Sequence, residues 1–503
     1  MLRSMPSTLS GTNPLELIDV VERVIPFLDF ESLLAVRTIS RLWYRLTQKQ
    51  LVPQSTVYWN EFEPEEKLAA IASDLNKTRV LTIDTKAYTG KGLWSIPQRE
   101  ARKVLYDPLM KAMSDPAKNR LLEEIVFRGG MAAEEDLFPV LPSMAHLQRL
   151  TIEPHPEITY ADRGGLLKIL GESRPGGPGE SLRELTMRHG RWHSTSKPST
   201  AQCRVQKLVL DRVNMMDQNV MSVLHSCPEL EELVAIRTLA RWAIPIMKSM
   251  STSCPKLKRL TFDNGIAWNA LQMGWLTRFF EPELEALTIY GYDGNGLEDM
   301  LTTLGTRFTR LEKLELRQCQ GSGSNTHSPM KIGLGLLKFL AELSPQLQHL
   351  SVPDAEWSPV QLKEDGRRLA NCGLHTLEIG ISDGTEMKDT VEFLEDQWPQ
   401  LRYLTLTHLN LREPAQDLRA LKQLKDLVRV RLVVDALGPL VAAKDELKTF
   451  VFGKPGVWPL LSRFEIVYRT SQEDPTSIQE LGEWFRQEAR PLVTFSFDQL
   501  QEA

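Results

Sequence analysis

Apolar residues recur along most of the chain in one short pattern, in which leucines are separated by polar positions. The pattern is clearest between residues 227 and 289, where Pro-x-Leu-x-x-Leu-x-(apolar) occurs three times at intervals of 27 residues, with first leucines Leu230, Leu257 and Leu284. Within each copy, the alternation predicts a strand with one buried face and one polar face. A fixed period of this length indicates a solenoid, in which each repeat packs on its neighbours.

The same phrase continues beyond this stretch. From residue 147 onward its first apolar residue falls at Leu147, Leu182, Val205, Leu230, Leu257, Leu284, Leu311, Leu347, Leu374, Leu401, Leu427, Leu447 and Leu461. Two steps are longer than the rest, at 35 and 36 residues, and hold segments rich in Gly, Pro and Ser after Leu170 and Cys319. These segments are expected to form loops that protrude from one face. A closing strand is expected at 493–497.

Helical patterns fill the intervals between the phrases, as in residues 297–308 and 334–343. A proline stands two residues before the next leucine in many repeats, at positions 228, 255, 282, 345, 399 and 459. Proline cannot extend a helix, so each is expected to end a helix and lead into the next strand. The phrase resembles the leucine-rich repeat, and its Cys-Pro-x-Leu version resembles the cysteine-containing subfamily. The resemblance implies an α/β leucine-rich-repeat solenoid, with a curved parallel sheet inside and helices outside.

Residues 13–50 carry a different pattern. Apolar residues keep helical spacing from Leu17 to Leu28 and again from Leu33 to Leu46. A few short helices of this kind cannot bury all of their apolar surface among themselves. The block is therefore expected to need a partner protein or a neighbouring domain.

This block resembles the F-box, the helical module that docks substrate receptors on the Skp adaptor of cullin–RING ubiquitin ligases. The family pattern Leu-Asp, Leu-Leu, Val-Cys-Arg and Trp is matched in order by Leu28-Asp29, Leu33-Leu34, Ile39-Ser40-Arg41 and Trp43. The family's opening Leu-Pro-x-Glu has two candidates, 13–16, which lies three residues too far upstream, and 17–19, which lacks the proline. By this resemblance, the adaptor contacts would come from Pro14, Leu17, Ile18, Leu28, Leu33, Leu34, Val36, Ile39 and Trp43.

An F-box followed by leucine-rich repeats is similar to the fungal-type substrate receptors of SCF ubiquitin ligases. The resemblance implies a non-catalytic protein without a cofactor. Its partners would be the Skp-type adaptor, through it the cullin and RING subunits, and an unknown protein substrate held by the repeats. The alternative is a leucine-rich-repeat scaffold or protein-binding module without a ubiquitin-ligase role, in which the N-terminal helices only cap the first repeat.

Four segments follow from these patterns. Residues 1–12 are expected to be disordered, 13–50 to form the F-box-like module, 51–130 to be a transition with degenerate opening repeats, and 131–503 to form the solenoid with a C-terminal cap. Within the transition, the sequence predicts a helix through Leu68 and Leu75 and strands at 80–83 and 122–127.

The composition places the chain among globular proteins. Of its 503 residues, 42% are hydrophobic and 25% charged, and the net charge is −5, so neither a nucleic-acid partner nor a membrane partner is expected. The N-terminus lacks the apolar core of a signal peptide, and no apolar run is long enough to span a membrane. The five cysteines include no Cys-x-x-Cys pair, which favours reduced thiols in a cytoplasmic or nuclear protein.

Motifs for catalysis are absent from the sequence. It contains no phosphate-binding loop, no Gly-x-Ser-x-Gly elbow and no His-Glu-x-x-His. His189 and His193 have a spacing that suits a metal on a helix, but they follow a strand phrase and lack a third ligand, which favours loop histidines. No catalytic, cofactor or metal site is predicted.

Strand alternation indicates where a ligand would bind. The leucines point into the core, so the residues between and just after them should face the concave surface. Three columns result: Arg149, Glu184, Lys207, Glu232, Arg259, Lys313 and Arg429; Thr151, Thr186, Thr261, Thr288 and Thr405; and Arg188, Asp211, Asp263, Tyr290 and Arg317. The mixed charge favours a protein or peptide ligand, and Arg and Tyr are favoured at interface hot spots. The predicted substrate-binding residues are Arg188, Asp211, Arg259, Asp263, Tyr290 and Arg317.

Overall fold

The structure is a computed structural model of the chain. It describes residues 54–58, 65–84, 106–129, 139–154, 161–162, 178–189, 191–193, 202–215, 217–238, 244–268, 283–292, 308–318, 330–331, 346–357, 373–381, 385–409, 411, 413–436, 439–440, 460–470 and 494–499, together with 274, 276, 278 and 483. The F-box-like block 13–50, with every residue predicted to contact the adaptor, lies outside the described residues. So do the predicted helices 297–307 and 334–343.

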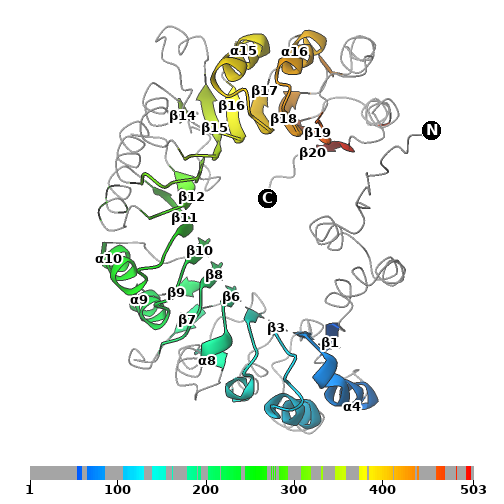
Figure 1. The fold of residues 1–503 in the computed structure, drawn as a ribbon, viewed down its shortest axis with the longest axis vertical. Helices are drawn as coiled ribbons and strands as arrows, with labels where there is room; N and C mark the ends of the chain where they lie inside the picture. The colour runs from blue at the N-terminus through cyan, green and yellow to red at the C-terminus, as the bar shows by residue number, and fades with distance from the viewer. Residues whose placement is uncertain are drawn as a thin grey trace, which may run out of the picture. The chain divides into compact units, whose positions relative to one another are not determined.

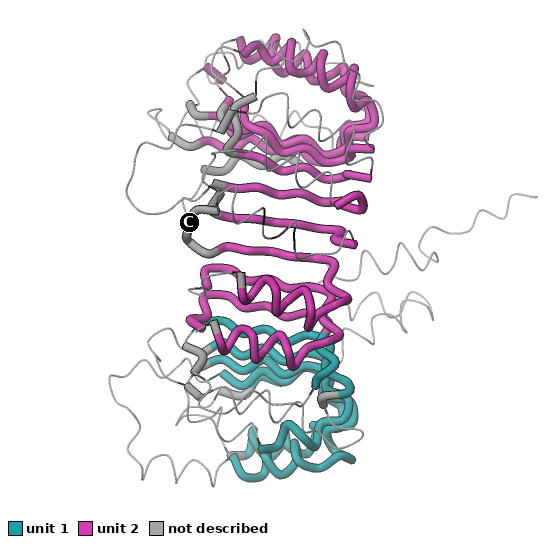
Figure 2. Tube along the Cα trace, turned by 90° about the vertical axis from the view of Figure 1, so that its left-hand side faces the viewer, with its two compact units in different colours: residues 1–205 teal, residues 206–503 magenta. Residues whose placement is uncertain are grey.

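The chain divides into two compact units, residues 1–205 and 206–503, which Figure 2 colours teal and magenta. In unit 1 the described strands pair in parallel in the order β1-β2-β3-β4-β6. These strands are β1 (Gln54–Tyr58), β2 (Val80–Asp84), β3 (Glu124–Gly129), β4 (Arg149–Pro154) and β6 (Glu184–Arg188). Two short strands, β5 (Ala161–Asp162) and β7 (Arg191–His193), form a separate parallel pair. The helical segments are α4 (Glu65–Asp74), η3 (Leu75–Lys77), residues 106–114, η4 (Leu141–Ser143) and α8 (Pro178–Ser181).

Unit 2 is built in the same way around a longer parallel sheet. Its strands pair in the order β8-β10-β11-β12-β13-β15-β16-β17-β18-β19-β20, and β14 pairs with the far end of β15. The strands are β8 (Lys207–Asp211), β9 (Asn214–Met215), β10 (Glu232–Ile236), β11 (Arg259–Trp268), β12 (Ala286–Tyr292), β13 (Lys313–Gln318), β14 (Met330–Lys331), β15 (His349–Trp357), β16 (Thr376–Ile381), β17 (Tyr403–Leu409), β18 (Arg429–Ala436), β19 (Arg463–Thr470) and β20 (Thr494–Gln499). The helices are α9 (Asp217–Ser226), α10 (Ile244–Ser253), α15 (Met387–Gln397), α16 (Pro414–Ala420) and η6 (Leu421–Gln423).

The repeated leucines explain where the strands begin and what they bury. The main strands from β4 to β19 start two residues after the first apolar residue of a phrase, as β11 does after Leu257. Leu260 and Phe262, the inward residues of β11, are 1% and 0% exposed. Pairing keeps equivalent residues in line, so Phe262 lies between Ala235 of β10 and Ile289 of β12. The predicted α/β architecture with a long parallel sheet is confirmed, and it is compatible with a solenoid.

The helices of unit 2 lie on one side of its sheet, with α9, α10, α15 and α16 outside the curve that the strands line (Figure 1). The predicted role of proline as a helix stop is confirmed at three of them. Helix α9 ends just before Cys227-Pro228, α10 just before Cys254-Pro255, and α15 just before Trp398-Pro399. Among the described residues, no helix is long and apolar enough to cross a membrane.

A cysteine of this motif contacts the turn between helix and strand. Cys203, Cys227 and Cys254 are all buried. The Sγ atom of Cys254 lies 3.5 Å from the backbone oxygen of Leu224 and 3.6 Å from that of Cys227, so its thiol can donate to the turn of the preceding repeat. A small, weakly polar side chain is suited to this position because it fills the core and still satisfies a buried carbonyl.

The chain leaves three of the strands through a left-handed residue. His189, Arg212 and Arg237 have φ values of 58°, 57° and 51°, and each occupies the same place in its repeat, just after β6, β8 and β10. Such values are uncommon for residues other than glycine. In the next two repeats, the equivalent positions are Asn264 and Gly291. Asparagine and glycine are the residue types that tolerate positive φ values best.

One strand of the sheet was not predicted from the sequence: β1, which pairs in register with β2. The phrase Leu447-x-x-Phe450-x-Phe452, which was expected to continue the repeat, lies outside the described residues. Strand β18 pairs directly with β19 from Arg429↔Arg463 to Ala436↔Thr470.

Candidate ligand-binding face

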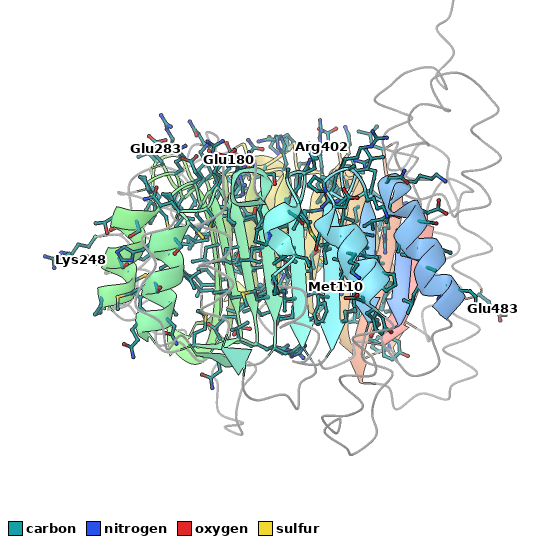
Figure 3. All side chains as sticks on the ribbon, turned by 90° about the horizontal axis from the view of Figure 1, so that it is seen from below. Met110, Glu180, Lys248, Glu283, Arg402 and Glu483 are labelled. Carbon is teal, nitrogen blue, oxygen red and sulfur yellow. The ribbon has the colours of Figure 1, made fainter. Side chains whose placement is uncertain are left out.

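The candidate site is the sheet face opposite the helices, here called the concave face. In β11, for example, Arg259, Thr261 and Asp263 are partly exposed, whereas the alternate residues are buried. Figure 3 shows many charged side chains at the edge where the strands begin, with Glu283 and Arg402 labelled there in unit 2, and Lys248 of α10 pointing away from the sheet. The described strands therefore present partly exposed polar side chains on the concave face.

The register brings three of the predicted residues side by side. Asp263 of β11 pairs with Tyr290 of β12, and Tyr290 pairs with Arg317 of β13. The guanidinium carbon of Arg317 lies 5.9 Å from the centre of the Tyr290 ring, within range for a cation–π interaction. Asp211 belongs to the same column, separated from Asp263 by Ile236 of β10.

A network of hydrogen bonds surrounds these residues, and its members form what is here called the central polar cluster: Tyr290, Glu315, Arg317, His349, Ser351 and Glu378. Arg317 Nη2 lies 3.0 Å from Glu378 Oε2, reaching across β15 to β16. Ser351 of β15 donates to the same carboxylate oxygen. Two strands are thus tied by an ion pair that passes over the strand between them.

Glu315 is the most heavily paired carboxylate of the cluster. Its Oε1 atom lies 3.0 Å from both His349 Nε2 and Lys313 Nζ, and its Oε2 accepts from Thr288 Oγ1 at 3.2 Å. Burial alone would raise the pKa of Glu315, but the hydrogen bonds from His349 and Lys313 outweigh it and lower the pKa to about 2. Glu315 is therefore ionised over the whole physiological range.

The pKa of Tyr290 is shifted in the opposite direction, upwards. Burial raises the pKa of its hydroxyl, and the negative charges of Glu315, Asp263 and Glu378 act in the same direction, against the opposing effect of Arg317. The phenol thus stays neutral at physiological pH. A half-buried neutral tyrosine beside an arginine presents both an apolar ring and hydrogen-bonding groups to a ligand.

The other predicted contact residues do not join this cluster. Arg259 pairs with Glu232 on the neighbouring strand at 3.0 Å, and Asp211 lies 3.8 Å from its sequence neighbour Arg212. Arg188 belongs to unit 1, where its Nη1 atom lies 3.9 Å from Glu153 Oε2. The six predicted residues therefore fall into one group of three and three separate positions.

Several residues of the face were missed by the sequence analysis. Glu315, His349, Ser351 and Glu378 of the central polar cluster were not selected, nor were Arg431, Glu465 and Arg463 further along the sheet. The sequence did contain the information needed to select them. Each lies two or four residues after the first apolar residue of its repeat, as the residues of the first two columns do. Extending these columns to every strand would have included them.

The chemistry offered by the face is hydrogen bonding and ion pairing. Among the described residues, no group of three or more His, Cys, Asp or Glu side chains could hold a metal ion. Of the histidine pair considered in the sequence, His189 occupies the left-handed turn after β6 and His193 ends strand β7.

Replacing Glu315 with glutamine is expected to change how stability responds to acid. The folded-state pKa of about 2 lies below the ordinary value of 4.5, so the stabilisation by this carboxylate is complete above about pH 4.5 and is lost as the pH falls towards 2. At about pH 3 the native chain should have lost about 2 kcal/mol through Glu315, a loss that Glu315→Gln cannot show.

Urea unfolding at a series of pH values checks this expectation. Glu285→Gln is a matched control, because Glu285 lies in the same unit and its side chain is 35% exposed beside Lys258, compared with 13% for Glu315. Parallel acid profiles for the native chain and Glu315→Gln would contradict the assigned hydrogen bonds.

The comparisons with known proteins add little to this picture. No protein-family model matches the chain, and no curated protein matches it in sequence. Among solved structures, a protein from Bacteroides fragilis is similar at 14% identity, with 80% of this chain and 82% of that chain covered and a TM-score of 0.26. A TM-score of this size carries no argument, so the fold described above rests on the strand pairing itself.

Proposed function

We propose that this chain is a non-catalytic substrate receptor of an SCF-type ubiquitin ligase. In this proposal, an F-box at residues 13–50 docks on the Skp adaptor, and a leucine-rich-repeat solenoid holds a protein substrate on its concave face. Other subunits transfer the ubiquitin, and this chain supplies proximity and orientation.

The observation that carries the proposal is the order of two patterns along the chain. The F-box motifs from Leu28 to Trp43 precede a repeat whose strands pair in register over most of the remaining sequence. A docking module joined to a repeat-built binding surface suits a receptor, because the two interactions use separate parts of the chain. The pattern at 13–50 is a sequence argument, since this block lies outside the described residues.

The concave face supports the substrate-binding half of the proposal. It presents Tyr290 and Arg317 in contact with one another, surrounded by charges of both signs. Tyrosine and arginine contribute strongly to protein interfaces, and charges of mixed sign favour specificity for a protein over a uniformly charged polymer. The proposed substrate contacts are Asp263, Tyr290 and Arg317, with Asp211 and Arg259 on the neighbouring strands of unit 2 and Arg188 in unit 1.

Adaptor binding tests the proposal against its alternative. The purified full chain, mixed with a Skp-type adaptor, is expected to elute with it as a single complex on size exclusion. A second repeat protein without an F-box serves as the control for non-specific capture. A chain that elutes apart from the adaptor would instead be a leucine-rich-repeat scaffold or protein-binding module without a ligase role.

A further inference from the structure

Three arginines surround one carboxylate on the concave face of β18 and β19. Glu465 accepts two hydrogen bonds from Arg429 Nη2, at 2.9 Å to Oε1 and 3.0 Å to Oε2. Arg463 contacts the same carboxylate through its Nε atom, and Arg431 Nε lies 3.8 Å from Oε2. Arg429, Arg431 and Arg463 are here called the arginine cluster.

The cluster carries more positive charge than Glu465 can balance. The carboxylate is 5% exposed, whereas the arginine side chains are 41%, 39% and 47% exposed. Among the described residues, Glu465 is the one carboxylate paired with these arginines. Two positive charges thus remain without a balancing anion in the described part of this face, and their guanidinium groups reach solvent.

Arg431 has the weakest contact with Glu465 of the three arginines. Its distance to Glu465 exceeds hydrogen-bonding range, and its Nε atom is buried without a hydrogen-bond partner. The Arg431 side chain is nevertheless 39% exposed, so an anion can approach the outer part of its guanidinium group from solvent. Glu465 meanwhile holds Arg429 and Arg463 in place, which reduces the entropy lost on binding.

The strand register extends the cluster into a small binding surface. Arg429 lies between Tyr403 of β17 and Arg463 of β19, and Arg431 lies between Thr405 and Glu465. Tyr403 is 43% exposed, which is unusual for a large side chain on this sheet. The surface thus combines an exposed aromatic ring with guanidinium groups, the two side-chain types most favoured at the centre of protein interfaces.

We propose that the arginine cluster binds an acidic peptide segment of a protein partner, with a carboxylate of that segment accepting hydrogen bonds from Arg431 and its neighbours. Guanidinium groups present donors in the geometry that a carboxylate accepts in pairs. The inference rests on the substrate-binding half of the proposed function, and it names the class of substrate segment. It does not depend on the adaptor.

The surrounding charges favour a short acidic peptide over a nucleic acid. The chain has a net charge of −5, and on the same face Glu315 and Glu378 are paired with Lys313 and Arg317. Because the described charges around these strands are paired, a long polyanion would find no continuous positive surface along the sheet. A local excess of two positive charges suits one or two carboxylates.

Fluorescence anisotropy with the full chain tests the inference. The probe is a labelled peptide of alternating glutamate and serine, and the reference is the same peptide with glutamine in place of glutamate. The glutamate peptide is expected to bind and the glutamine peptide is not. Arg431→Gln should weaken binding at least about tenfold, since a hydrogen bond to a charged group contributes about 1.5–3 kcal/mol. Arg431→Lys should retain part of the affinity because it keeps the charge.

A second variant tests the same site while keeping all three arginines. Thr405→Glu places a carboxylate next to Arg431 in the register, where it would compete with the peptide. It is also expected to weaken binding about tenfold. Arg402→Gln is the matched control, because Arg402 is an exposed arginine at the edge of the same sheet, just before β17 (Figure 3), and its loss should leave binding unchanged.

Equal binding of the two peptides would overturn the proposal, and so would an Arg402→Gln variant as weak as Arg431→Gln. Circular dichroism of each variant verifies that it is folded. The assay contains no adaptor, so its outcome is separate from that of the proposed function. A chain that binds the peptide but not the adaptor keeps this site and loses the ligase role, whereas one that binds the adaptor but not the peptide does the reverse.

Discussion

Replacing both Leu33 and Leu34 with glutamate is expected to abolish binding of the Skp-type adaptor. In the F-box pattern these leucines occupy apolar positions that the adaptor would cover. Full burial of one leucine contributes about 1.5–3 kcal/mol, and each introduced carboxylate would be buried without a partner, which adds a further penalty. The combined loss corresponds to several factors of ten in affinity.

Size exclusion with the adaptor and a melting curve by circular dichroism, both on the same variant, decide the outcome. The matched control is Leu33→Met with Leu34→Met, which conserves apolar character and approximate volume and should still bind. The repeats fold on contacts with their neighbours, so their melting transition should persist in the glutamate variant. Loss of that transition would identify the block as a cap of the repeats, and unchanged adaptor binding would reject the F-box assignment.

Replacing Phe262 with alanine is expected to lower the local stability around β11 by about 3–5 kcal/mol. Phe262 is fully buried, and it lies in register between the small Ala235 and the larger Ile289. Removing the ring therefore leaves a cavity that neither flanking strand can close without moving the whole repeat.

Native-state hydrogen exchange measures this loss strand by strand. Amides of β10, β11 and β12 should open more readily in Phe262→Ala, whereas those of β17 should change little, because repeats interact mainly with their neighbours. Phe262→Leu is the matched control and should lose less than about 1.5 kcal/mol, since it keeps most of the volume. An equal change in all strands of unit 2 would contradict a nearest-neighbour arrangement.

The strand that the sequence analysis missed shows what apolar spacing does not report. Strand β1 has little apolar alternation, and its pairing with β2 through Thr56↔Thr82 defines it as a strand. Spacing reports the tendency of a segment to bury one face, and long-range pairing decides whether that face finds a place in the sheet.

The sequence by itself determined the repeat and its register. Leucines recurring every 27 residues must bury one face, and because side chains alternate along a strand, the residues between them must face the other way. The third column, from Asp211 through Asp263 and Tyr290 to Arg317, was therefore predictable to the residue.

Only the tertiary structure decided which of these side chains interact. Arg317 passes over β15 to reach Glu378, and three arginines converge on Glu465 from two strands. A long side chain on a sheet has several possible partners within reach. Which ion pair it forms depends on how buried each partner is and on the other charges nearby. The repeat period of the sequence places residues in columns along the sheet. The charges and burial of neighbouring columns then determine which ion pairs form. In the arginine cluster, three arginines share one carboxylate, so positive charge remains in excess.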